Sequence, residues 1–254
     1  MLPRTFEKRR ADAPPGFFEA EAAGLRWLAD ARGVDVVEVL SVDQAHITIR
    51  RVAEIRPAAA AARQFGRDLA ATHNAGAIAF GAPPHGYDGP LFIGRRALPA
   101  AHSSTWGVFY ANDRVRPYLN QAEHSGYLSA SGRAVVERAC DRIATGEFDD
   151  DDVPSRIHGD LWSGNVLWSP SGVVLIDPAA HGGHRETDLA MLALFGCPFL
   201  EEILAGYHIE HALKAGWQNR VALHQLHPLA VHAAGHGPSY GAELTHAAEA
   251  VLAL

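Results

Sequence analysis

The spacing of apolar residues predicts an α-helix near the start of the chain, with short β-strands before and after it. The apolar residues of FFEAEAAGLRWLADARG recur at helical intervals, and Gly33 after them is a helix stop signal. These apolar residues are Phe18, Ala22, Leu25 and Ala29. TFEKR, VDVVEVL and HITIRRV have the apolar or alternating patterns of strands. The pattern therefore predicts a strand, a helix and further strands, in this order.

The pattern changes after Pro57. AAAAARQFGRDLAATHNAG is rich in alanine and predicts a helix, and a loop rich in glycine and proline follows over residues 81–94. WGVFYANDRVRPYL and SGYLSASGRAVVERACDRIATG predict further helices, as does most of the chain from Asp188 onward. We therefore expect an α+β protein with a small N-terminal lobe over residues 1–54. A larger, mainly helical lobe would occupy residues 55–254.

Composition and charge narrow the class of protein. The chain has 254 residues, of which 48% are hydrophobic and 20% are charged, which is typical of a globular protein. The formal net charge of −7 favours neither nucleic acid nor an anionic membrane as a partner, and no apolar run is long enough to span a bilayer. The two cysteines predict no disulfide framework and a reducing, cytoplasmic setting. The acidic run Asp149–Asp152 is expected to be a solvated loop.

A polar motif in the middle of the chain sits beside a predicted β-hairpin. NVLW (165–168) and VVLID (173–177) are strand candidates, and SPSG between them predicts a four-residue turn. If Trp168 pairs with Val173, then Asn165 pairs with Ile176. The amide of Asn165 would then lie beside the carboxylate of Asp177 at the open end of the hairpin.

The same end of the hairpin receives a third oxygen-bearing side chain. Asp160 precedes Asn165 by five residues, in the loop IHGDLWSGN. A site with one or two carboxylates and an amide oxygen suits Mg²⁺, because this ion also binds substrate phosphates. A free carboxylate nearby could accept the proton of a hydroxyl that attacks a phosphate. The residues themselves therefore indicate Asp160 as a catalytic base, with Asn165 and Asp177 as metal ligands.

This order of residues resembles the catalytic loop and metal-binding segment of the protein-kinase-like fold. Gly159 in the His-Gly-Asp motif is typical of its small-molecule branch, which includes aminoglycoside and choline kinases. HGDLWSGN followed by DPAAHGGHRETDLAMLALFG resembles the fructosamine kinase (ketosamine-3-kinase) family. The resemblance implies a two-lobed fold, ATP and Mg²⁺ as cofactors, and phosphorylation of the sugar 3-hydroxyl of a fructosamine or ribulosamine. The ketosamine would be carried by a small amine or a glycated lysine, and the role would be deglycation repair.

The resemblance also assigns the nucleotide site. Lys8 would hold the α- and β-phosphates of ATP with Glu21 as its ion-pair partner, and a carboxylate bordering the buried helix face needs such a partner. The linker around Arg51 and Ala53 would contact adenine. In the family's fold two strands and a Gly-rich loop precede this lysine. Seven residues precede Lys8 here and none is glycine, so we expect a truncated small lobe without that loop.

Further residues are expected around the acceptor. Trp162 could form a wall for the face of a sugar, or could belong to the core. His184, Arg185 and Glu186 follow the metal-binding aspartate and could hold a sugar–amine, or could pair with one another.

His158 is expected to orient the catalytic loop, and Asp188 to cap it from the next helix. Clustered histidines late in the chain have no supporting zinc motif, so we interpret them as helix-bundle residues. These are His181, His184, His224, His227, His232 and His236. Two other functions stay open: a related kinase for aminoglycosides or choline, and a catalytically impaired, pseudokinase-like binding protein.

Overall fold

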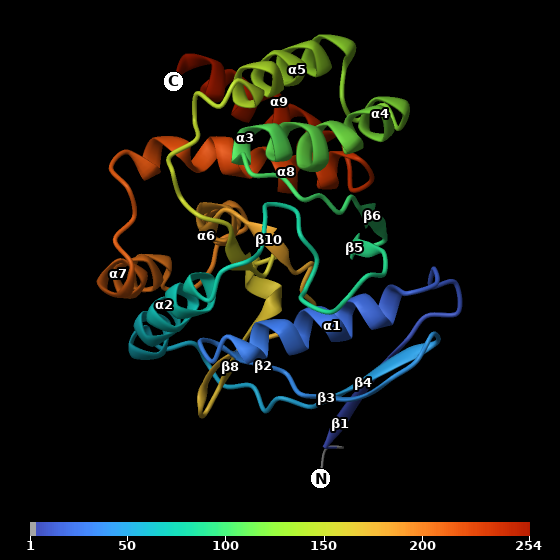
Figure 1. Ribbon diagram of the computed structural model, residues 1–254, viewed down its shortest axis with the longest axis vertical. Coiled ribbons are helices and arrows are strands. Elements are labelled where there is room, and N and C mark those ends of the chain that lie inside the picture. Colours follow the sequence, from blue (N-terminus) through green and yellow to red (C-terminus); the bar gives the residue numbers. More distant parts are fainter. Residues whose placement is uncertain (1–3) are drawn as a thin grey trace.

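A computed structural model describes residues 4–254 of the chain (Figure 1). Its first sheet has the antiparallel strand order β1-β4-β3, and helix α1 packs against one face of this sheet (Figure 1). The bounds of these elements are β1 Thr5–Arg9, α1 Phe17–Asp30, β3 Val39–Val42 and β4 His46–Arg50. Phe18, Ala22 and Leu25 are buried against this sheet, as the spacing predicts, whereas Ala29 is exposed. The buried face of α1 therefore ends at Leu28.

The segment VDVVEVL forms two short strands that belong to different sheets. β2 (Asp35–Val36) pairs in parallel with β9 (Gly172–Leu175), while β3 pairs with β4. The amide of Val37 extends the first ladder by donating to the Leu175 carbonyl at 3.0 Å. The second sheet therefore has the order β2-β9-β8 and connects the N-terminal part of the chain to the central hairpin.

The central hairpin has the predicted register. Trp168 in β8 (Val166–Ser169) pairs with Val173 in β9, and the Ile176 amide donates to the Asn165 carbonyl at 3.2 Å. The prediction of a four-residue turn is wrong, because Ser169 and the glycine at position 172 also pair. That glycine has a φ of 131°, which closes the hairpin through a tight turn of two residues.

The remaining elements are mainly helical, as the pattern predicts (Figure 1). The helices are α2 Ala59–Asn74, α3 Trp106–Phe109, α4 Arg116–His124, α5 Ala130–Ala144, α6 Arg185–Leu194, α7 Leu200–Glu210, α8 Val221–Ala233 and α9 Pro238–Ala253. The short strands are β5 Leu91–Ile93, β6 Arg96–Leu98, β7 Ser155–Ile157 and β10 His181–Gly183. A π-helical turn over Tyr110–Val115 joins α3 to α4, and Pro117 just after it lacks the amide hydrogen of a regular helical ladder.

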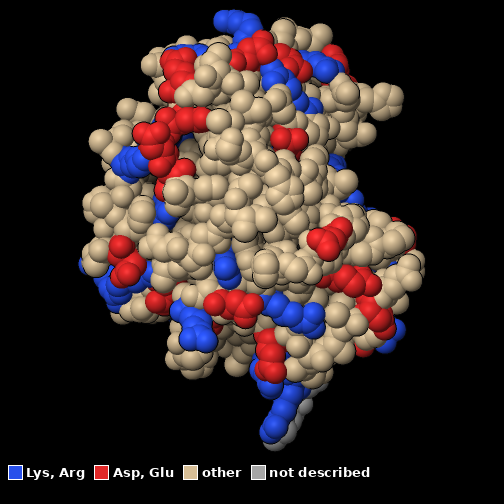
Figure 2. All heavy atoms as spheres, in the orientation of Figure 1, with Lys and Arg blue, Asp and Glu red and all other residues tan. Residues whose placement is uncertain are grey.

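Helices α2 and α7 lie side by side, and glycines permit their close approach (Figure 1). A Cβ atom on Gly66 would overlap the Ile203 carbonyl, and one on Gly206 would overlap the Arg63 carbonyl. A second core lies among α4, α5, α8 and α9. Within residues 4–254, no helix is both long enough and apolar enough to cross a membrane. Acidic and basic side chains are interspersed toward the two ends of the face in Figure 2, around a largely uncharged centre.

Candidate active site

The loop between β7 and β8 is held in place by one buried carboxylate of α6. Asp188 accepts hydrogen bonds from the backbone amides of His158 at 2.7 Å and Gly159 at 2.9 Å. Gly159 has a φ of 78°, and a Cβ atom there would overlap the Ala179 carbonyl oxygen. This position therefore requires glycine, and the loop follows a path fixed by Asp188 and Ala179.

His158 is buried under this loop and holds the backbone of Asp160. Its Nδ1 accepts the backbone amide of Asp160 at 3.2 Å, and its Nε2 donates to the Ile176 carbonyl at 2.9 Å. Burial lowers the pKa of His158, so the ring stays neutral and keeps this tautomer. His158 thus links the loop to the strand that leads into Asp177.

Three oxygen-bearing side chains meet at the open end of the hairpin. The Asn165 side-chain amide donates to the backbone carbonyl of Asp160 at 2.8 Å and to its carboxylate at 3.2 Å. The same nitrogen lies 3.5 Å from the Asp177 carbonyl. Because the Asn165 nitrogen faces Asp160, its oxygen is the atom that can bind a cation together with the Asp177 carboxylate.

The two carboxylates at this end have different environments. Burial raises the pKa of Asp160 to about 7, and the hydrogen bond from Asn165 opposes the rise. The Asp177 side chain is 41% exposed, and its backbone has a φ of 55°, which is unusual for a residue with a side chain. A carboxyl whose pKa lies near neutrality can exchange a proton with a hydroxyl.

Lys8 of β1 reaches this site from the opposite side. Its ammonium donates to Glu21 of α1 at 2.8 Å and also forms an ion pair with Asp177. Burial acts to lower the pKa of Lys8, but the two carboxylates hold that pKa above its usual value. For Glu21, burial has the opposite sign and raises the pKa of the carboxyl. The expected Lys8–Glu21 ion pair is therefore present, and it lies beside the hairpin carboxylate.

Three adjoining cavities share these residues. The first, of about 420 Å³, lies between β1, β4 and the hairpin, and its wall includes Ile49, Leu167 and Ile176. It meets a second cavity of about 320 Å³ at Lys8 and Asp177. The second meets an open cleft of about 770 Å³ at Asp160 and Trp162. The apolar first cavity suits a planar base, the second suits phosphates and a cation, and the third suits an acceptor.

Of the two linker residues expected to contact adenine, only Arg51 lines the first cavity. Arg51 lines the first cavity, together with Val52 and Glu54. Ala53 is outside that lining and faces a neighbouring surface depression instead. Arg51 and Val52 line both spaces, whereas Ala53 lines only the depression.

Trp162 lies at the junction of the second cavity and the cleft. Its side chain is 41% exposed, so it is a wall of the site and not part of the core. Its ring also meets Phe195 edge to face, with centroids 6.4 Å apart.

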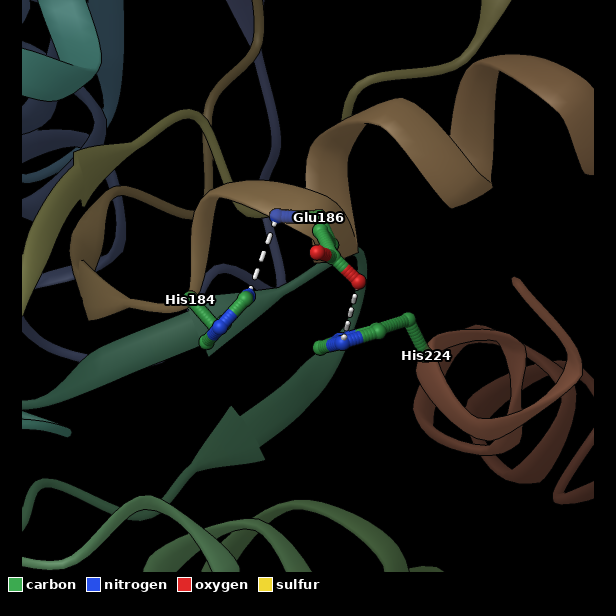
Figure 3. A group of neighbouring side chains, drawn as sticks. All are labelled: His184, Glu186 and His224. Atoms are coloured by element: carbon green, nitrogen blue, oxygen red, sulfur yellow. Dashed lines mark hydrogen bonds and ion pairs between the residues drawn. The ribbon is translucent and has the colours of Figure 1, made fainter. Parts of the chain in front are cut away.

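His184, Arg185 and Glu186 do not reach the cleft, which corrects their expected contact with the acceptor. All three are buried at the start of α6 and line none of the three cavities. Figure 3 shows that His184 and Glu186 face His224 of α8. We call His184, Glu186 and His224, with Asp150 and Arg220, the α6 cluster.

The α6 cluster also corrects the prediction that the acidic run is solvated. Asp150 accepts from His184 at 3.2 Å, and Asp152 accepts from Arg185 at 2.6 Å. Arg220 donates to both carboxylate oxygens of Glu186, at 2.5 and 2.9 Å. Two carboxylates of the run thus face inward because buried basic side chains require them, and Asp151 alone is exposed.

The α6 cluster has the residue types of a metal site, but its hydrogen bonds fill the ligand positions. His184 Nδ1 accepts the Glu186 amide at 3.2 Å, the bond that begins α6, so the neutral ring carries its proton on Nε2. That nitrogen has no lone pair for a cation. Glu186 is already bound by Arg220 and lies 3.4 Å from His224. The cluster therefore stabilises the start of α6.

Sequence reasoning missed the residue that supports Asp188. His73 of α2 is buried and contacts Asp188 at 3.2 Å and the Tyr207 hydroxyl at 2.8 Å. Burial acts to raise the pKa of Asp188, but the bonds from His73 and His158 hold it below its usual value. A histidine on the apolar face of an alanine-rich helix was the available signal, but sequence spacing does not reveal its distant partner.

A loop aspartate, a hairpin amide–carboxylate pair and a lysine–glutamate ion pair around one cleft define a kinase-like phosphotransferase. Solved structures of this class have the same fold. One is an aminoglycoside phosphotransferase, APH(4)-Ia, in a ternary complex with ADP and hygromycin B; its TM-score is 0.58 at 17% identity, covering 93% of this chain and 82% of that one.

The fructosamine kinase family model matches residues 3–254, and the chain belongs to this family. A crystal structure of a fructosamine-3-kinase candidate from Thermobifida fusca has a TM-score of 0.91 at 44% identity, covering 98% of this chain and 86% of that one. The protein of Enterococcus faecium named probable ketoamine kinase is 30% identical over 94% of this chain and 84% of its own. The Escherichia coli K12 protein named probable ketoamine kinase YniA is 31% identical, over 85% of this chain and 73% of its own.

Proposed function

We propose that this chain phosphorylates the 3-hydroxyl of a fructosamine or ribulosamine, using ATP and Mg²⁺, and so acts in deglycation repair. The acceptor would be a ketosamine on a small amine or a glycated lysine. The observation that carries the proposal is the convergence of Asp160, Asn165 and Asp177 where the three cavities meet. Residues 1–54 would form the nucleotide lobe, and residues 55–254 the catalytic and acceptor lobe.

The residues of the first two cavities fit a nucleotide and its cation. Lys8 would hold phosphate oxygens, and Arg51, with the backbone of the linker, would contact the edge of the base. Asn165 Oδ1 and the Asp177 carboxylate would hold Mg²⁺. Bound ATP–Mg²⁺ supplies the phosphoryl group and offsets its negative charge. Lys8 would then exchange its ion pair with Asp177 for the phosphates, while Glu21 keeps the ammonium in place.

The acceptor would lie in the open cleft with its sugar against Trp162. Asp160 would accept the proton of the attacking hydroxyl, because its carboxylate lies at the boundary between the cleft and the phosphate cavity. Asn165 holds that carboxylate at 3.2 Å, and His158 fixes the backbone that carries it. The free, buried thiols of Cys140 and Cys197 support a reducing, cytoplasmic setting.

A substrate panel tests the proposed function. We expect ATP consumption with fructosamines and ribulosamines and none above background with choline or an aminoglycoside. Turnover restricted to an aminoglycoside would show a different acceptor class. Nucleotide binding without turnover on any ketosamine would instead favour an impaired, pseudokinase-like protein.

The metal ligands are tested separately. Asp177→Ala is expected to weaken Mg²⁺-dependent nucleotide binding by about tenfold or more, because it removes the carboxylate of the cation site. Calorimetric titration with and without Mg²⁺ measures this change. Unchanged affinity would remove Asp177 from the cation site.

A further inference from the structure

The acceptor cleft has an unusual balance of charge for a site that would receive an amine. Its walls come from the β5–β6 turn, α4, the catalytic loop and the end of α8 with the turn after it. Among the described residues that line it, Asp160 is the only carboxylate, whereas Arg95 and Arg96 both line it. His232 and His236 line the side formed by α8, with ring centroids 4.9 Å apart. The cleft therefore presents cations and aromatic surfaces around a single base.

The two arginines at the β5–β6 turn form no ion pair in the described part of the chain, although Arg95 is near enough to Asp12 to help lower the pKa of that carboxyl, whose main partner is Arg10. Within residues 4–254, neither guanidinium has a carboxylate oxygen within 4.0 Å or a hydrogen bond to another residue. By contrast, Arg116 outside the cleft pairs with both Glu137 and Asp141. Because two guanidinium groups without ion pairs line one cleft, an anion bound there would be stabilising.

Arg96 is held at the cleft by a close approach to the backbone. A Cβ atom on Gly235, in the turn after α8, would overlap the Arg96 guanidinium. The missing side chain at position 235 therefore leaves the space that the guanidinium fills. Its sequence neighbour Arg95 is exposed at the cleft mouth.

A third arginine adds positive charge behind the wall of the cleft. Arg114 is buried one helical turn before Tyr118, whose ring lines the cleft. Its guanidinium donates to the Pro99 carbonyl at 2.7 Å and to His181 at 3.1 Å. In the described part of the chain no carboxylate lies within ion-pair distance of it. Its charge is therefore not offset locally and adds to the potential of the cleft.

We propose that the natural acceptor carries an anionic group, a carboxylate or a phosphate, which binds to Arg95 and Arg96 while the sugar lies against Trp162. This inference rests on the proposed ketosamine kinase function and specifies its substrate class. A ketosamine built on a free amino acid or on an amine phosphate has such a group, whereas one on an internal lysine side chain of a protein does not. A single guanidinium group can bind either anion through two parallel hydrogen bonds.

Three acceptors that differ in one group test the inference on the wild-type chain. They are fructose ketosamines of β-alanine, of 2-aminoethyl phosphate and of propylamine, and kcat and KM are measured for each at saturating ATP. We expect a KM for at least one anionic acceptor about tenfold below that for the propylamine compound. A preference for β-alanine assigns a carboxylate and a preference for the phosphate compound assigns a phosphate. The advantage should shrink at high salt.

Matched variants locate the anion. Arg95→Gln with Arg96→Gln is expected to abolish the tenfold advantage and to leave the KM for the propylamine compound and for ATP within about twofold. Arg138→Gln, on an exposed arginine of α5 outside the cleft, should change none of these values. Gly235→Ala keeps both charges but displaces the Arg96 guanidinium, and should reduce the advantage while thermal unfolding stays unchanged.

Equal KM values for the three acceptors in the wild type would overturn the inference while the kinase function stands. A rise in the KM for ATP in the arginine variant, with acceptor KM unchanged, would also overturn it, because the arginines would then serve the nucleotide. Absence of turnover on all three ketosamines would overturn the proposed function and this inference with it.

Discussion

The reaction centre and the α6 cluster are built from the same kinds of side chain and differ in how many of their polar atoms are already bonded. In the α6 cluster each carboxylate faces a buried basic group, and Glu186 is bound by Arg220 through both oxygens. At the reaction centre the Asp160 carboxylate accepts one hydrogen bond from Asn165, the Asp177 carboxylate pairs with Lys8, and both residues line a cavity. The comparison shows that hydrogen-bond satisfaction, more than residue type, separates a site that stabilises from one that can react.

The strongest test of the reaction centre removes the charge of the base. Asp160→Asn is expected to lower kcat by about 10²–10⁴-fold, the usual contribution of a general base. Asn has the same shape, so nucleotide affinity and the melting temperature should change little. Steady-state kinetics and calorimetric titration check both parts. A variant with near-normal kcat would show that another group takes the proton.

Asp188 belongs to the structural side of the comparison although it lies next to the catalytic loop. Asp188→Asn removes a buried charge that two backbone amides and His73 require, so unfolding free energy should fall by about 3 kcal/mol. Urea denaturation measures the loss. A stable variant with normal kcat would show that the loop does not depend on this carboxylate.

Low pH should lower the unfolding free energy, because several histidines are buried in the neutral form. Burial lowers the pKa of His224 to about 4 and that of His227 to about 3. Below the unfolded value of about 6.5 the unfolded chain binds protons that the folded chain does not, so stability falls as pH falls. We expect each of these two histidines to contribute a loss of about 2 kcal/mol between pH 7.5 and 5.

Two histidine variants measure how much of this loss arises in the α6 cluster. His224→Gln should reduce the pH-dependent loss, and His246→Gln, on an exposed residue of α9, should leave it unchanged. Urea denaturation at the two pH values gives the numbers. Identical pH dependence in the two variants would contradict the assignment to His224.

The smallest expected effect separates neighbours within the acidic run. Asp150→Asn weakens a hydrogen bond from buried His184 and loses an ion pair with Arg220, and should cost about 1–2 kcal/mol of unfolding free energy. Asp151→Asn is the matched control, because Asp151 is exposed and has a φ of 61°, which Asn tolerates. Its effect should stay within about 0.5 kcal/mol. Equal losses of unfolding free energy in the two variants would contradict the assignment of Asp150 to the α6 cluster.

Local chemistry in the sequence was sufficient to predict most of the helices, the strands that flank α1 and the residue pairs of the central hairpin. Asn165 lies opposite Ile176 because a period of two and one turn fix every pair along a hairpin. The ion pair of Lys8 with Glu21 was predicted from the resemblance to the family, and a carboxylate at the border of a buried face, which needs a partner, supported it.

Contacts between distant segments could not be predicted in this way. Nothing local in the acidic run shows that Arg220, about 70 residues later, will neutralise Asp150. The same limit hid His73 and led to the expectation that His184 and Glu186 would meet the acceptor. Charged residues near a catalytic motif are ambiguous until the fold shows which of them have partners.

The most direct test of the central claim is the structure of the product. Wild-type protein is incubated with ATP, Mg²⁺ and a fructose ketosamine, and the product is examined by two-dimensional ³¹P–¹H correlation. The account predicts a new phosphate ester that couples to the proton on carbon 3 of the sugar, and no such signal with Asp160→Asn. Folded protein that binds nucleotide but forms no phosphate ester on any ketosamine would contradict it.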